Sequence, residues 1–222
     1  MSFFERLQRE TEAERRALYE VPLIRDALAG AISRETYLAY LTQAYHHVKH
    51  TTPLLMTAGG RLTQAQNNVR KAFAEYIEEE IGHEEWILND IEAAGGDKEA
   101  ARASEPYAAT ELMVAYAYDT VTRGNPVAFL GMVFVLEGTS TSLATQAAET
   151  LMGSLGLKRN CFSYLLSHGA LDIEHMKFFA SLVETLESEE DKRAIIHMAK
   201  RMFVLFADMF RSIPHRTQEM AA

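Results

Sequence analysis

The apolar residues of this 222-residue chain recur at steps of three and four along almost its whole length. These steps match the period of an α-helix and place the apolar side chains on one face of it. No segment has the alternating Val, Ile and Thr pattern of a β-strand, and only five prolines and twelve glycines interrupt the helical pattern. The sequence therefore predicts an all-α fold.

Helix breakers divide the pattern into about seven helices, which we expect to pack as a single-domain helical bundle over residues 1–222. One domain is expected because about 100–200 residues are typical of a domain. The seven expected segments are 3–28, interrupted at Pro22; 34–58, bent or broken near Pro53; 63–94; 110–122; 125–152; 159–186; and 188–213, with an additional short helix over 97–103.

Charge and cysteine content exclude several classes of function. The chain has 22 Lys and Arg against 31 Asp and Glu, a net charge of −9, and no dense basic cluster, so we expect no nucleic-acid partner. A single cysteine excludes a disulfide framework and a Cys-rich metal site. The first ten residues are charged where a signal peptide is apolar, and the apolar run 126–136 is too short to span a bilayer. We expect a cytoplasmic protein without a membrane partner.

Two polar residues interrupt the apolar face of the segment 63–94. Glu80 and His83 lie within the stripe that includes Phe73, Tyr76 and Ile87. A carboxylate and an imidazole are costly on a core-facing surface unless they are paired or bind a metal. Glu-x-x-His is also the spacing by which helical bundles hold carboxylate-bridged pairs of metal ions.

Four more residues of the same kind face inward on two other helices. His168, Asp172 and His175 share one apolar face of the segment 159–186, and Glu137 ends the apolar run of the segment 125–152. Three carboxylates and three imidazoles exceed what one ion needs, and this mixture of oxygen and nitrogen donors suits two iron or manganese ions. We interpret the six residues as a metal site.

Two alternatives stay open at this point. Taken alone, a buried pair such as Asp172 with His175 is usually structural, Glu80 and His83 could be a helix-surface pair, and Glu137 could be the buried partner of an arginine. Glu79, Glu84 and Glu85 lie close to Glu80 and His83 in the sequence. Glu79 could replace Glu80 as a ligand because it precedes His83 by one helical turn.

A second histidine cluster lies on the segment 34–58. His46 and His50 are one turn apart, on the side away from the apolar stripe, and His47 flanks that stripe. We interpret these three as solvated or pocket-lining residues rather than as metal ligands.

Three blocks of the sequence resemble the ligand blocks of a known family. They are Glu-Glu-Ile-Gly-His-Glu-Glu-Trp at 79–86, Leu-Glu-Gly-Thr at 136–139, and the His-x-x-x-Asp-x-x-His pattern at 168–175. They resemble those of the heme-oxygenase-like dinuclear iron oxidases, or iron-containing redox enzymes, which are related to TenA-type proteins and pyrroloquinoline quinone synthase. The resemblance implies a heme-oxygenase-like bundle, two bound irons, O2 as co-substrate and a small-molecule substrate, and it makes a homodimer possible. By position, the implied ligands are Glu80, His83, Glu137, His168, Asp172 and His175.

The expected function is therefore that of a non-heme di-iron oxidase or oxygenase acting on a small organic substrate. A metal-free oxidase or hydrolase of the same fold, using His46, His47 and His50 as acid–base groups, is one alternative. A non-enzymatic helical binding or regulatory protein is the other. No residue pattern identifies the substrate.

Overall fold

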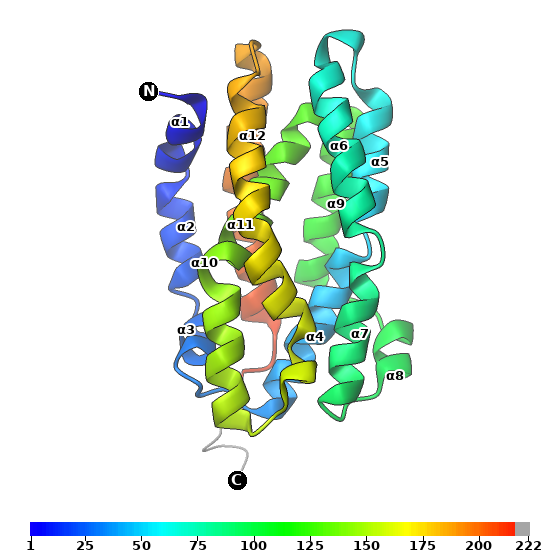
Figure 1. Cartoon of the computed structure of the whole chain (residues 1–222), viewed down its shortest axis with the longest axis vertical. Coiled ribbons are helices and arrows are strands. Elements are labelled where there is room, and N and C mark those ends of the chain that lie inside the picture. Colours follow the sequence, from blue (N-terminus) through cyan, green and yellow to red (C-terminus); the bar gives the residue numbers. More distant parts are fainter. Residues whose placement is uncertain (216–222) are drawn as a thin grey trace.

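The helices of the chain run along the long axis of an elongated bundle (Figure 1). The structure is a computed structural model that describes residues 1–215, apart from the side chains of 168–174. The helices are α1 (Phe3–Glu10), α2 (Glu12–Tyr19), α3 (Pro22–Leu28), α4 (Arg34–Val48), α5 (Thr51–Arg61), α6 (Asn67–Glu80), α7 (His83–Ala93), α8 (Lys98–Ala103), α9 (Ala108–Arg123), α10 (Phe129–Leu155), α11 (Ser163–Glu184) and α12 (Glu189–Ser212), with 3-10 turns η1 (Gln64–Gln66), η2 (Pro126–Ala128) and η3 (Arg159–Cys161). The prediction of an all-α single domain is confirmed.

The described residues form helices α1 to α12, so the expectation of about seven helices was too low. The extra helices come from breaks inside the long predicted segments. The segment 3–28 divides at Thr11 as well as before Pro22. The segment 34–58 breaks near Pro53, as predicted: the break falls at Lys49 and His50, and Pro53 lies in the first turn of α5. A proline is tolerated there, but its ring would clash with the carbonyl four residues earlier and so prevents α4 from continuing.

The segment 63–94 is also broken, in the middle of the first predicted ligand block. The helix α6 ends at Glu80, Ile81 is extended, and Gly82 has a left-handed φ of 93° that a residue with a side chain rarely adopts. The helix α7 begins at His83. One continuous helix through this block was therefore a wrong prediction, because the pattern of apolar residues carried no sign of the left-handed turn.

The helix α10 lies at the centre of the bundle and packs against α11 and α12. Its first turns, Phe129–Val135, are buried on every side, as expected of a helix that is apolar all round. The stretch Pro126–Leu155 is long and apolar enough to cross a membrane by length and composition, but 67% of its apolar window is buried inside the bundle. This stretch is therefore a helix of the protein core, and Glu137 lies about a third of the way along α10.

The start of α11 is fixed to α7 by one buried carboxylate. Asp90 is fully buried and accepts hydrogen bonds from the backbone N–H of Ser163 at 3.0 Å and of Tyr164 at 2.9 Å, and from the Ser163 hydroxyl at 2.5 Å. These N–H groups have no partner within the helix, so the carboxylate satisfies them. Burial raises the pKa of Asp90, and the hydrogen bonds partly oppose that rise. The contact holds together the two helices that carry His83 and His175.

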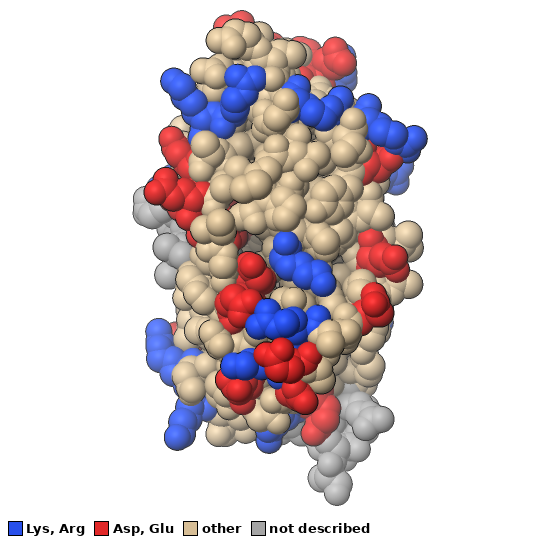
Figure 2. Space-filling model, turned by 90° about the vertical axis from the view of Figure 1, so that its right-hand side faces the viewer, with Lys and Arg blue, Asp and Glu red and all other residues tan. Residues whose placement is uncertain are grey.

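Charged residues of both signs gather on the lower part of one face of the bundle, and the region above them is mostly uncharged (Figure 2). The lower part includes α7 and α8, which are joined by the ion pair of Arg102 with Glu85. Surface ion pairs contribute about 0–1 kcal/mol each, so this face adds little to stability but sets the position of α8 against α7.

Candidate metal centre and its cavity

The first carboxylate–histidine pair spans the turn between α6 and α7. Glu80 is the last residue of α6 and is 8% exposed, and His83 is the first residue of α7 and is 4% exposed. Their Oε2 and Nδ1 atoms are 3.1 Å apart. The imidazole also stacks on the indole of Trp86, with 3.9 Å between ring centroids. The structure thus brings this predicted pair together across a turn, where the sequence had suggested a single helix face.

The second pair joins α10 to α11. His175 and the side chain of Glu137 are both largely buried, and His175 Nδ1 lies 3.7 Å from Glu137 Oε1. The other nitrogen of the ring, Nε2, lies 2.9 Å from Oε2 of Glu79 on α6, a distance typical of a hydrogen bond. Tyr76, one turn before Glu80, presents its ring edge-on to the imidazole at 5.9 Å. One imidazole therefore lies between carboxylates from two other helices.

Both pairs border a single cavity of about 160 Å³. Glu80 and Glu137 line it, together with Tyr76 and with His47 of α4, and most of the remaining lining is apolar or aromatic. Buried carboxylates at the wall of an apolar cavity are costly unless a cation or hydrogen bonds compensate their charge. The donors are carboxylate oxygens and imidazole nitrogens, which suit iron or manganese.

The described side chains supply pairs of donors and no complete site. Among them, no group of three or more His, Cys, Asp or Glu residues is arranged to hold a metal ion. The predicted ligands His168 and Asp172 belong to α11, but their side chains lie outside the described residues. The six-residue ligand set therefore stays a prediction.

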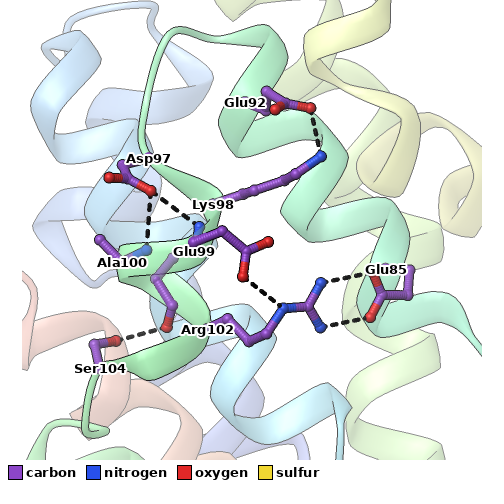
Figure 3. Close-up of polar contacts among 9 residues, drawn as sticks. Glu85, Glu92, Asp97, Lys98, Glu99, Ala100, Arg102 and Ser104 are labelled. Atoms are coloured by element: carbon purple, nitrogen blue, oxygen red, sulfur yellow. Dashed lines mark hydrogen bonds and ion pairs between the residues drawn. The ribbon is translucent and has the colours of Figure 1, made fainter.

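The three glutamates that could have replaced Glu80 are distinguished by their contacts. Glu85 receives two hydrogen bonds from the Arg102 guanidinium, at 2.7 and 3.0 Å, and points toward α8 (Figure 3). Arg102 holds the pKa of Glu85 below its usual value. Glu79 contacts His175, so it remains a candidate ligand or a hydrogen-bond partner of one. Glu84, half-buried, has no contact that assigns it to the site.

The cavity also has polar residues that the sequence analysis missed. Thr139 and Ser140 follow Glu137 on α10, and both line the cavity. Their hydroxyls are buried and have no hydrogen-bond partner in the part of the chain that the structure describes. By contrast, Thr141 and Ser142 donate to backbone carbonyls of their own helix, at 2.8 Å in each case. A run of four hydroxyl residues was a visible signal, but only the packing of α10 separates the two pairs.

Two residues of the second histidine cluster, His46 and His47, are buried rather than solvated, and His50 is half-buried. His46 is 1% exposed and His47 is 4% exposed, so the expectation that His46 faces away from the core is wrong. The helix α4 packs against α7 and α9 as well as along its apolar stripe, and these neighbours cover the His46 side. His47 lines the cavity, as one of the two interpretations predicted, and its ring meets Phe206 edge-on.

The contacts of His46 oppose its use as the base of a hydrolase. Lys49 Nζ lies 3.2 Å from His46 Nδ1, and His46 Nε2 lies 2.9 Å from Ser104 Oγ. An ammonium group can only donate, so Nδ1 is the acceptor and the Nε2–H donates to Ser104. The Ser104 hydroxyl itself donates to the carbonyl of Ala101 at 2.8 Å. The serine is thus not activated by the imidazole, as a nucleophile would have to be.

We expect the stability of the protein to fall as the pH drops below that of neutral solution, in part because of His46. Burial, followed by the charges of Lys49 and His50, lowers the pKa of His46 from 6.5 to about 4. Between these values the unfolded chain binds a proton that the folded chain does not, so stability rises with pH through this window and is lost as the pH falls through it. The full difference corresponds to about 3 kcal/mol at most.

Urea unfolding at pH 7 and pH 5 measures this loss. The variant His46→Gln should lose less stability between the two pH values than the parent protein. The exposed His197 on α12 provides the matched control, and His197→Gln should keep the parent's pH dependence. An unchanged pH dependence in His46→Gln would contradict the assignment.

Comparison with known proteins adds a family and a fold. The family model described as iron-containing redox enzyme matches residues 38–207. A domain of unknown function with a heme oxygenase-like fold from Shewanella denitrificans OS217 is 24% identical, with a TM-score of 0.86 over 95% of this chain and 91% of that one. A TenA homologue from Pseudomonas syringae pv. tomato is 11% identical (TM-score 0.80, 94% and 91% covered), and the heme oxygenase of Leptospira interrogans is 18% identical (0.76, 95% and 98%). No curated protein matches the chain. At these identities the structures establish the heme oxygenase-like fold alone.

Proposed function

Because the chain belongs to the iron-containing redox enzyme family, we propose that it is a non-heme di-iron oxidase or oxygenase that uses O2 to oxidise a small organic substrate. The observation that carries the proposal is the pairing of inward carboxylates and histidines at one cavity. Glu80 with His83 and Glu137 with His175 are the described members of the set. His168 and Asp172, which belong to α11, complete the proposed ligand set.

The donor set fits iron. It offers carboxylate oxygen and imidazole nitrogen without thiolate, and the carboxylates come from different helices, as they do in di-iron bundles. Two divalent ions would compensate the charge of the three proposed carboxylate ligands. Iron, when bound, supplies the redox chemistry with O2 that no amino-acid side chain can perform.

The residues of the chain itself position and shield that chemistry. The wall formed by α4, α10 and α12 is largely apolar, and such a lining strengthens electrostatic interactions within the cavity. Glu79 either accepts a hydrogen bond from His175 Nε2 or would itself be a ligand of the metal. Asp90 fixes α11 relative to α7, so that the two histidine-bearing helices keep one relative position.

Iron stoichiometry is the direct test of this proposal. Loading the purified chain with Fe(II) under anaerobic conditions should give close to two irons per chain, and an iron-soaked crystal should give anomalous peaks among α7, α10 and α11. Oxidase activity in a protein that takes up no metal would favour the metal-free alternative. Neither metal uptake nor turnover would favour the non-enzymatic one.

A further inference from the structure

The cavity is much longer than it is wide. Its lining on α10 extends from Phe129 to Leu151, which is about 33 Å of helix at the ~1.5 Å rise per residue. A cavity of about 160 Å³ that borders so long a stretch of α10 is elongated along that helix, and we call it the tube below. An elongated cavity favours a linear chain over a compact ring system.

One end of this tube is apolar. Beyond Glu137 it continues between α10 and α3, through Leu143, Ala147 and Leu151 on one side and Ile24 and Ala27 on the other. The two helices pack side by side (Figure 1). No lysine or arginine lines the described cavity, so this arm provides no partner for an anionic group.

The part of the tube next to Glu137 is polar. Thr139 is 7% exposed, and its hydroxyl and that of Ser140 are the buried groups without a partner described above. A buried hydroxyl left without a hydrogen bond costs about 1–3 kcal/mol, so a ligand that supplies one gains that amount. These two hydroxyls therefore favour a ligand with an oxygen- or nitrogen-bearing group at this level of α10.

From these observations we propose that the cavity binds an amphiphilic chain molecule, with its alkyl tail between α3 and α10 and its polar head hydrogen-bonded by Thr139 and Ser140 beside Glu137. The tail fills the apolar arm, where it passes between Ala27 and Ala147. The role of this molecule as substrate rests on the proposed function, since the head then lies at the proposed metal centre. Its binding to the cavity requires no metal.

Calorimetric titration of the metal-free full chain with butanol, hexanol, octanol and decanol tests the binding. Burial of each added methylene should tighten binding about fourfold until the arm is full. The double variant Thr139→Val with Ser140→Ala should bind octanol about tenfold more weakly. The matched control, Thr141→Val with Ser142→Ala, should bind octanol as the parent does, because those hydroxyls bond to their own helix.

A second variant tests where the tail lies. Ala147→Phe should lose binding of decanol while keeping that of butanol, and retained butanol binding also reports an intact fold. Gln146→Phe places the same ring on the exposed side of α10 and should leave the whole series unchanged. Affinity that does not rise with chain length, or benzyl alcohol binding more tightly than hexanol, would overturn the proposal. Iron stoichiometry is measured without any alcohol, so failure of the proposed function and failure of this inference are seen separately.

Discussion

Replacing Glu137 by glutamine is expected to remove iron binding without unfolding the protein. Glu137 lies on α10 and lines the cavity, and its Oε1 atom is 3.7 Å from His175 Nδ1. Substitution of residues that only support metal ligands costs about 10–100-fold in metal affinity. Loss of a residue that itself would hold iron should therefore weaken iron binding by more than about 100-fold, with loss of turnover. Iron per chain, measured after desalting an Fe(II)-loaded sample, checks the expectation.

The stability of the metal-free variant separates a metal ligand from a structural residue. Glu79 and Glu137 both flank His175, so removing one negative charge leaves the imidazole a carboxylate partner. We expect the free energy of unfolding of metal-free Glu137→Gln to change by less than about 1 kcal/mol. Glu149→Gln, on the exposed side of the same helix, should keep both iron and stability. A large loss of stability with iron binding retained would assign Glu137 to a structural network instead.

Replacing Gly131 by alanine is expected to give the largest loss of stability. An added Cβ at this position would lie 2.4 Å from the carbonyl oxygen of Ile195 and 2.8 Å from the backbone nitrogen of Ala199. These are backbone atoms of α12, so they cannot rotate away as a side chain could. Overpacking of this kind costs about 3 kcal/mol, which for a chain of this size lowers the Tm by roughly 6–12 °C. Thermal unfolding followed by circular dichroism provides the measurement.

Gly153 provides the matched control on the same helix. An added Cβ there meets no atom within 4 Å, and the position is exposed. Gly153→Ala should therefore stabilise the protein by roughly 0.5–1 kcal/mol, because alanine is the better helix former. If the two substitutions had equal effects, the close approach of α10 and α12 would not be what requires glycine at 131. Because α10 carries Glu137, a separation of these helices should also weaken iron binding.

The sequence by itself determined that the fold is helical and which residues deserve attention as ligands. The three- and four-residue steps of apolar side chains report the helical period directly, and the polar residues on those faces stand out because burying them is costly. The pairing of Glu80 with His83 followed from their spacing even though the helix breaks between them, because three residues in chain order stay close across a tight turn. The family followed from the same blocks.

The tertiary structure decided what depends on neighbours that are distant in the chain. His46 and His47 lie on different sides of α4, and only the packing of α7, α9 and α12 determined that both are buried. The hydroxyls of Thr139 and Ser140 differ from those of Thr141 and Ser142 in nothing that a residue name records. They line the cavity because of the way α10 packs against helices that are distant in the chain. Local periodicity carries no information about it, so the length of the cavity, and with it the chemistry of the ligand, had to come from the fold.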